Sequence, residues 1–183
     1  FRSQDGDFSF TALKQRYNSE LANDVGNLLN RSLAMLNKYR DGVLPEPGEL
    51  NDSDRALIAD VQAMQVDVAE ALDRQAFHLA IERISVVVRH GNRYVEDNAP
   101  WALAKQGDDE RLNIVLYHLV ETLRLVAMQL LPFMPTKMNL MLSQINNQDM
   151  SDERLSYAEQ GGWGLLKAGH QCAKPSPIFP RME

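Results

Sequence analysis

The sequence predicts an all-α protein, a helical bundle followed by an irregular C-terminal tail. Apolar residues recur at three- and four-residue steps over most of the first 145 residues, which is typical of amphipathic helices. No segment shows the alternation of apolar and polar residues that predicts a strand. Prolines and glycines separate the periodic segments, so the helices are joined by short links. We therefore divide the 183 residues into a bundle over 1–145 and a tail over 146–183.

The first predicted helix covers about residues 9–39 and ends at the Asp41-Gly42 turn. Asn18 and Ser19 are residue types that cap helices, so the segment is either one kinked helix or two. A turn with two prolines follows at 44–48.

Three helices come next. Ser53 can cap a helix that runs to Leu72, and another helix covers about 76–96 with Phe77 directed inward. Since the residue before a proline avoids the helical region, that helix ends before Pro100. Pro100 can then open a short helix that reaches Lys105.

A long helix is predicted from the Gly107-Asp108-Asp109 segment to Leu130, with Pro132 and Pro135 closing it. A short helix covers 136–145, and the periodicity fails after Asn146. The tail is expected to pack back on the bundle through its apolar residues, which are Leu165, Leu166, Ile178 and Phe179.

The composition is that of a globular domain, with 44% hydrophobic and 24% charged residues, which excludes disordered and collagenous chains. The net charge of −6 does not indicate a general nucleic-acid binder, so RNA binding needs a local patch and DNA binding is not expected. One cysteine, Cys172, allows no internal disulfide and fits a reducing compartment, which we expect to be the cytoplasm or an organelle.

No transmembrane helix is expected, because charges interrupt the apolar stretches, and the start does not resemble a signal peptide. The chain begins with Phe1 rather than Met, so we expect it to be a piece of a longer polypeptide.

No pattern of nucleophiles or metal ligands indicates an active site. The phosphate-cradling, dinucleotide and Gly-x-Ser-x-Gly motifs do not occur, and the four histidines are scattered. His118 and Glu121 share a helix face, but a core histidine with its hydrogen bonds satisfied is the better interpretation. We expect no catalytic residue and no metal in this chain.

Two features suggest recognition of nucleobases. Asn27 and Arg31 are neighbours on a helix face away from the apolar stripe, and an amide beside a guanidinium suits the edge of a base. Trp101 lies in the first turn after Pro100, at a bundle end, where a partly exposed indole suits base stacking. Nearby His90, Arg93 and Lys105 could hold phosphates. The alternatives are a solvated polar face for the first feature and an indole that plugs the bundle end for the second.

These residues resemble a known family. The segment Asn18–Arg31 is similar to the opening helix of the anticodon-binding domain of methionyl-tRNA synthetase, a class I aminoacyl-tRNA synthetase. Asn92-Arg93-Tyr94-Val95 followed by Ala99-Pro100-Trp101 resembles that family's second hallmark, and segments 163–169 and 177–181 resemble its closing segment. The likeness spans nearly the whole chain and implies the anticodon-binding helical bundle of class I synthetases.

The resemblance implies that this bundle reads the CAU anticodon of tRNA(Met). Trp101 would stack on the anticodon bases, while Asn27 and Arg31 would hydrogen-bond the first base, a cytosine. Four residues are candidates for supporting roles: Asn23, Arg93, Glu96 and Pro100.

The His-Ile-Gly-His type motif and the Lys-Met-Ser-Lys-Ser loop of the family are absent from this chain. ATP and methionine are therefore expected to bind a catalytic domain of the same polypeptide, and this chain alone to hold no cofactor and to activate no amino acid. Two alternatives stay open: a protein–protein or scaffold bundle without RNA readout, and an anticodon domain for another hydrophobic amino acid of class I.

Overall fold

A computed structural model describes residues 4–146 and 161–179, with only the backbone described at 4–14, 16–18 and 146. It confirms the all-α prediction. The described part contains six helices, which are α1 (Gln4–Arg40), α2 (Asp52–Asp73), α3 (Phe77–Asn98), α4 (Pro100–Gln106), α5 (Asp109–Leu130) and α6 (Pro135–Asn146). An isolated bridge between Val43 and Gln171 is the one β-type pairing in these residues.

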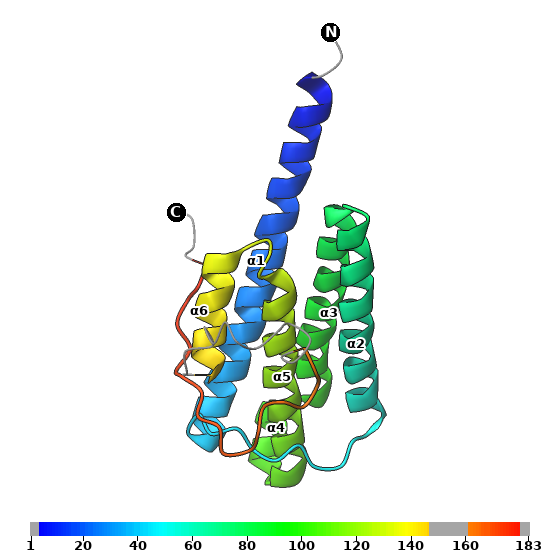
Figure 1. Cartoon of the computed structure of the whole chain (residues 1–183). Coiled ribbons are helices and arrows are strands. Elements are labelled where there is room, and N and C mark those ends of the chain that lie inside the picture. Colours follow the sequence, from blue (N-terminus) through cyan, green and yellow to red (C-terminus); the bar gives the residue numbers. More distant parts are fainter. Residues whose placement is uncertain (1–3, 147–160, 180–183) are drawn as a thin grey trace.

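Helix α5 is the centre of the bundle and contacts every other helix. Helices α2 and α3 form a hairpin on one side of it, and α1 and α6 lie on the other (Figure 1). From Leu112 to Leu130, only Asn113 of α5 is not buried. Helix α4 lies at the end of the bundle away from the N-terminus of α1, which extends past the other helices (Figure 1).

Helix α1 is continuous, so Asn18 and Ser19 start no second helix. Polar residues of these types cost a helix interior only a few tenths of a kcal/mol each, which tertiary packing easily overrides. The buried face keeps its helical phase from Leu21 to Leu36, where every apolar residue on it is inaccessible or nearly so. At the end of the helix, the Arg40 guanidinium donates to Asn113 and Asp109 of α5.

Helix α2 begins at Asp52, and Asn51 rather than the predicted Ser53 caps it. The Asn51 side chain accepts from the Asp54 amide at 3.0 Å, and the Asp54 carboxylate accepts from the Asn51 amide at 2.9 Å. This reciprocal capping box satisfies two backbone donors at once, whereas Ser53 already lies inside the first turn.

The expectation that Pro135 closes α5 is wrong, because α5 ends at Leu130 and Pro135 is the first residue of α6. Proline fits a first helical position, where its missing N–H costs nothing. The predicted inward position of Phe77 is also wrong. Phe77 is the first residue of α3, at a bundle end, and is 50% exposed. Its ring meets that of Phe133 edge-on, with the ring centroids 6.5 Å apart.

The described tail, 161–179, is irregular and packs on the bundle. Leu166 and Ile178 are buried and Phe179 is partly buried against the core, but Leu165 is 48% exposed, which contradicts its predicted packing role. In place of Leu165, Trp163 packs against the core at this point. The rest of the predicted tail, 147–160 and 180–183, lies outside the described residues.

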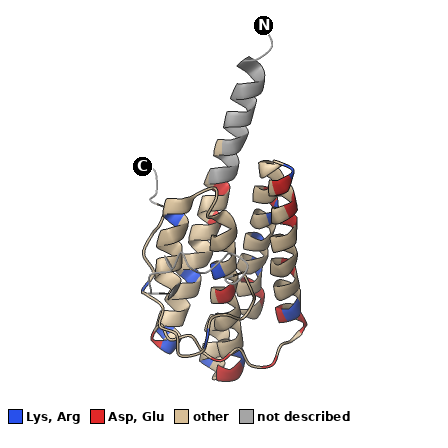
Figure 2. Cartoon of the chain, in the orientation of Figure 1, with Lys and Arg blue, Asp and Glu red and all other residues tan. Residues whose placement is uncertain are grey.

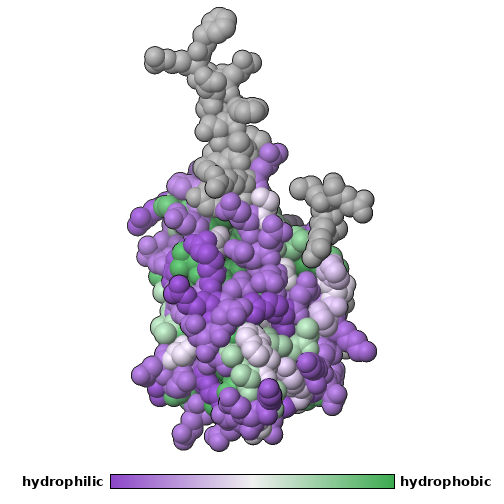
Figure 3. All heavy atoms as spheres, turned by 180° about the vertical axis from the view of Figure 1, so that it is seen from behind, coloured by the Kyte–Doolittle hydropathy of each residue, from purple (hydrophilic) through white to green (hydrophobic). Residues whose placement is uncertain are grey.

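Charged residues of both signs are interspersed over the ribbon rather than gathered on one helix (Figure 2). The face opposite to that of Figure 1 is mostly hydrophilic, with small separate apolar areas (Figure 3). Among the described helices, none combines the length and the apolar character needed to cross a membrane.

Candidate nucleic-acid interface

Asn27 and Arg31 of α1 are tethered to α3 by two equivalent side-chain contacts. The Asn27 amide donates to the Asn92 side chain at 3.1 Å, and the Arg31 guanidinium donates to the Glu96 carboxylate at 2.5 Å. Asn27 and Arg31 are four residues apart on α1, and their partners Asn92 and Glu96 are four residues apart on α3 in the same order. The two helices therefore run parallel here, and one face of each meets the other. The interpretation of Asn27 and Arg31 as a merely solvated face is therefore incomplete.

The two helices approach closely enough for these contacts because α3 carries a glycine. A Cβ atom at Gly91 would lie 2.8 Å from Cδ2 of Leu28, which is fully buried. A larger residue at this position would force Leu28 or the helices to shift. Asn92 adds a third contact, since its amide nitrogen donates to the Asp24 carbonyl at 3.2 Å.

The Arg31–Glu96 ion pair lies at the surface, with the side chains 29% and 60% exposed. Ion pairs of this kind contribute about 0–1 kcal/mol, because water screens them. A guanidinium carries five N–H donors, and only one is used in this contact. Arg31 is thus held in place while it keeps donors that an incoming polar ligand can use.

Trp101 is the second residue of α4 and is 45% exposed, which makes it one of the few large apolar side chains open to solvent. The preceding Pro100 is buried and opens α4, as predicted. Ala99 between α3 and α4 has φ 43° and ψ 66°, the left-handed region that a non-glycine residue rarely adopts. Helix α4, which carries Trp101, also contacts α1.

The sharp junction before Trp101 is fixed by a network that sequence reasoning missed. Asp54 of α2 is fully buried and accepts two hydrogen bonds from Arg111 of α5, at 2.6 and 2.9 Å. It accepts a third, at 2.5 Å, from the hydroxyl of Tyr94. Arg111 also donates to the Asn98 side chain at 2.5 Å, one residue before the strained Ala99.

The network keeps Asp54 ionised. Burial alone would raise its pKa, but the hydrogen bonds from Arg111 and Tyr94 outweigh burial, so the pKa lies below its usual value. Burial and the adjacent Asp54 raise the pKa of Tyr94, so Tyr94 stays a hydrogen-bond donor. The sequence signal that was available is the Asn51-x-x-Asp54 spacing of a capping box.

The other predicted site residues lie around Asn27, Arg31 and Trp101 in different environments. Asn23 and Arg93 are exposed, and Glu96 holds Arg31. His90, which lies next to Gly91 on α3, faces α2 instead, where its Nδ1 is 2.9 Å from the Asp60 carboxylate. Lys105 is exposed in the last turn of α4.

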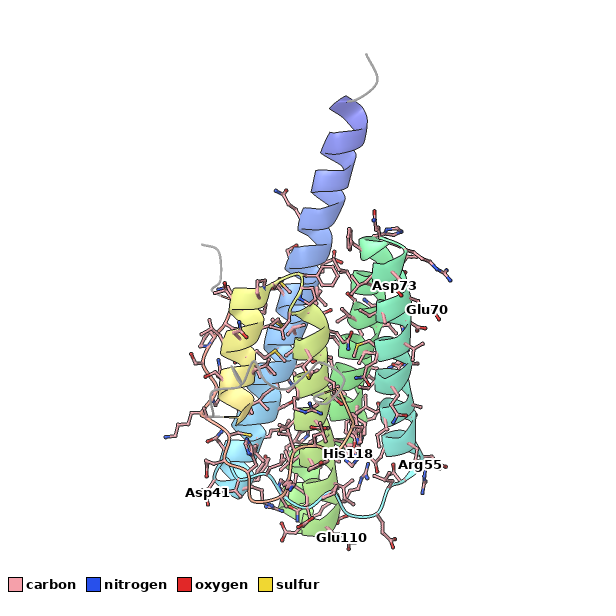
Figure 4. The ribbon with its side chains drawn as sticks, viewed as in Figure 1. Asp41, Arg55, Glu70, Asp73, Glu110 and His118 are labelled. Carbon is pink, nitrogen blue, oxygen red and sulfur yellow. The ribbon has the colours of Figure 1, made fainter. Side chains whose placement is uncertain are left out.

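His118 is a core histidine, in agreement with the preferred interpretation. It is 1% exposed inside the bundle (Figure 4), its Nδ1 is 2.6 Å from the Ile114 carbonyl, and its ring stacks on Trp163 with centroids 5.8 Å apart. Burial lowers the pKa of His118. Among the described side chains, no group of three or more His, Cys, Asp or Glu is placed to hold a metal ion.

Glu121, the neighbour of His118 on α5, anchors the tail. It is fully buried, binds the Arg124 guanidinium at 2.6 and 2.9 Å, and accepts from the amides of Gly164 and Leu165. The hydroxyl of Tyr117 donates to the Leu166 carbonyl at 2.7 Å. These groups serve tail packing rather than chemistry.

A family model described as the anticodon binding domain of methionyl tRNA ligase matches residues 44–183. A methionine–tRNA ligase from Caldanaerobacter subterraneus subsp. tengcongensis is 39% identical over 180 residues, which are 98% of this chain and 28% of that protein. One from Brucella melitensis biotype 1 is 36% identical over 182 residues, 97% of this chain and 34% of that protein. The chain thus spans about a third or less of the length of these relatives.

Comparison with solved structures points to the same family as the sequence comparisons. The apo form of Mycobacterium tuberculosis methionyl-tRNA synthetase superimposes with a TM-score of 0.82 at 34% sequence identity, over 92% of this chain and 34% of that one. The same synthetase in complex with methionyl-adenylate gives a TM-score of 0.82 over 93% of this chain and 33% of that one.

Proposed function

The chain belongs to the family of anticodon-binding domains of methionyl-tRNA ligases, and on that premise we propose that it reads the CAU anticodon of tRNA(Met) through Asn27, Arg31 and Trp101. The alternative of a scaffold bundle without RNA readout is not favoured by this membership. An anticodon domain for a different amino acid loses its support for the same reason.

One observation carries the proposal: a tryptophan that is 45% exposed stands on a junction that the rest of the molecule holds rigidly. Strained backbone, such as that at Ala99, persists where the surroundings over-determine it. A fixed, open aromatic face is what an unstacked anticodon base needs, since single-stranded loops present their bases for stacking and edge readout. Such stacking contributes about 1–3 kcal/mol per base.

Asn27 and Arg31 supply polar contacts for the first anticodon base. Cytosine presents the acceptors O2 and N3, which Arg31 can meet with N–H donors that its contact with Glu96 leaves unused. Uracil would place an N–H donor against one of those donors. A bidentate contact contributes about 1–3 kcal/mol of discrimination. Since stacking tolerates every base, the edge contact alone sets the discrimination against a wrong first base, roughly 5- to 150-fold.

The proposal extends to the whole polypeptide. Aligned residues that cover 97–98% of this chain make up only 28% and 34% of the two relatives. We propose that a catalytic domain outside these residues binds ATP and methionine and attaches methionine to tRNA(Met), most simply in the cytoplasm. The 183 residues would contribute the anticodon site and would bind neither small molecule.

The test is a fluorescence titration with anticodon stem-loops that carry CAU or GAU and are otherwise identical, at one low and one moderate salt concentration. We expect tight binding of CAU and weak binding of GAU. The variant Arg31→Gln should lose the preference for CAU. Glu96→Gln is its matched control, because it removes the same ion pair but keeps the Arg31 donors.

Equal loss of preference in both variants would contradict a direct contact between Arg31 and the base, and would assign the effect to the tether between α1 and α3. Equal affinity of the wild-type chain for CAU and GAU would contradict anticodon readout by this chain.

A further inference from the structure

Two arginines of α3 stand out because nothing in the described structure neutralises them. Most arginines with described side chains bind a carboxylate: Arg31, Arg40, Arg55, Arg83, Arg111 and Arg124. Among these described side chains, the guanidinium groups of Arg74, Arg89 and Arg93 have no hydrogen-bond or ion-pair partner. Arg89 and Arg93 are both exposed and share one helix, whereas Arg74 lies beyond the far end of α2.

Arg89 and Arg93 are neighbours in space. Residues four apart lie about 6 Å apart along a helix axis and nearly on the same face. Like charges at this spacing destabilise a helix by about 0.2–0.5 kcal/mol. The positions three and four residues from Arg89 hold Ser85, Val86, Asn92 and Arg93, so its own helix offers it no acid. An external anion would relieve this repulsion.

The pair borders the candidate anticodon site. Arg93 lies between Asn92 and Glu96, the two residues that bind Asn27 and Arg31. At about 100° per residue, Arg89 and Arg93 lie roughly 60° and 100° around α3 from Asn92. They therefore occupy the solvent side of the contact between α1 and α3, next to the Arg31–Glu96 pair.

The chemistry of the pair suits phosphate. A guanidinium matches two phosphate oxygens with parallel N–H donors, and two such groups can hold successive phosphates of one strand. The chain carries a net charge of −6, so RNA can approach only where positive charge is local. Two exposed acids of α3, Glu96 and Asp97, lie three and four residues after Arg93 and oppose this role. Glu96 already binds Arg31, which leaves Asp97 as the one of the two with no ion-pair partner among the described side chains.

We propose that Arg89 and Arg93 form a phosphate-binding pair that holds the backbone of the RNA strand whose bases are read at Arg31 and Trp101. This inference rests on the proposed function and adds to it the contact that positions the RNA backbone relative to the base-reading residues. Backbone contacts position a nucleic acid without reading its sequence. The pair should therefore increase affinity for every anticodon equally.

The experiment measures the affinity of the 183-residue chain for CAU and GAU stem-loops between about 50 and 200 mM salt. Each phosphate contact to a single strand adds about 0.7 to the slope of log K against log salt. We expect Arg89→Gln and Arg93→Gln each to lower the affinity about fivefold at ~0.1 M salt. The double variant should lower the slope by about 1.4 and leave the ratio of CAU to GAU affinity unchanged.

Arg74→Gln is the matched control, since it removes an exposed and unpartnered arginine at the other end of the hairpin. It should behave like the wild type. Asp97→Asn should strengthen binding of both RNAs. Circular dichroism checks that each variant keeps its helices.

A double variant whose slope and affinity match those of Arg74→Gln would overturn the inference, and so would a loss confined to CAU. If the wild type binds both RNAs equally but the double variant still lowers the slope, the phosphate pair stands and the proposed base readout fails. If the wild type binds neither RNA, both proposals fail.

Discussion

At the scale of single residues, the molecule separates the side chain that stacks from the groups that hold it. Trp101 is 45% exposed, whereas Asp54, which fixes its junction through Arg111 and Asn98, is fully buried. Trp101 can therefore be changed with little effect on the core. Asp54 cannot, because its removal leaves the buried end of Arg111 without a carboxylate.

This separation gives the first prediction. Trp101→Ala should weaken binding of the CAU stem-loop by about 1–3 kcal/mol, roughly 5- to 150-fold, because a stacking surface is lost. Helicity by circular dichroism should stay nearly unchanged. Trp101→Phe, which keeps an aromatic face, should recover most of the affinity. If Trp101→Ala instead unfolds the bundle, the indole is a plug of the bundle end rather than a stacking platform.

The second prediction concerns the pH dependence of stability. Burial lowers the pKa of His118 below its usual 6.5, so below pH 6.5 the unfolded chain binds a proton that the folded chain resists. The free energy of unfolding should therefore decrease as the pH falls from about 7.5 to 5, by at most about 1.4 kcal/mol per pH unit for this group. Urea unfolding at several pH values measures the effect.

His118→Gln supplies the comparison. It should reduce the stability at neutral pH but flatten its dependence between about pH 7 and 5. The carboxyl groups with lowered pKa, Asp54 and Asp60, act in a different window, because their stabilisation is lost only below about pH 4, near their usual value of 3.8. An equally steep dependence in the variant would assign the effect to other groups.

At the scale of elements, periodicity predicted the helices, whereas local rules placed some of their ends correctly and failed at others. The apolar spacing placed each helix within a few residues, because burial of one face dominates helix stability. Ser53 and Pro135 were misassigned because serine is accepted both at a cap and in the first turn, and proline both after one helix and at the start of the next. The surrounding contacts decide which of these positions the residue takes. The capping box at Asn51 was readable from the sequence, whereas the partners of Asp54, 40 and 57 residues away, were not.

The same limit applies to the candidate site. Asn27, Arg31 and Trp101 could be selected from residue type and helix face, and from the resemblance to a known family. Their partners Asn92 and Glu96 lie 65 residues further along the chain. Which helix face meets which is set by packing, here by the contact of Gly91 with Leu28, and a single sequence does not display it.

The third prediction tests the attachment of the tail to α5. Glu121→Ala removes a buried carboxylate that binds Arg124 twice and accepts from the Gly164 and Leu165 amides. Breaking a buried ion pair costs about 3–5 kcal/mol, because the remaining charge loses its counter-charge. Urea unfolding should show a loss of this size, and Trp163 fluorescence should report release of the tail.

Glu121→Gln is the control for charge. It keeps an acceptor for the tail amides and should cost less than Glu121→Ala. Glu96→Ala, which removes an exposed carboxylate, should change stability by less than about 1 kcal/mol. If Glu121→Ala is as stable as Glu96→Ala, the tail is held by its apolar contacts instead.

At the scale of the whole molecule, the helices and the described tail share one hydrophobic core. Buried residues from α1, α2, α3, α5 and α6 join Leu166, Cys172 and Ile178 of the tail in a single cluster. The chain should therefore unfold as one cooperative unit, and a ligand that binds the folded state should raise its Tm. That makes thermal unfolding a direct test of which ligands this chain binds.

The fourth prediction uses this cooperativity. A CAU stem-loop at about 100 times its Kd should stabilise the chain by about 2.7 kcal/mol. For a chain of this size, that corresponds to a rise in Tm of roughly 5–10 °C. ATP with methionine should leave the Tm unchanged, because we assign both to a catalytic domain outside these residues. Because phosphate contacts release counterions from the RNA, the shift caused by RNA should shrink as salt is added. A shift caused by methionine at any salt concentration would instead place an amino-acid site within the bundle itself.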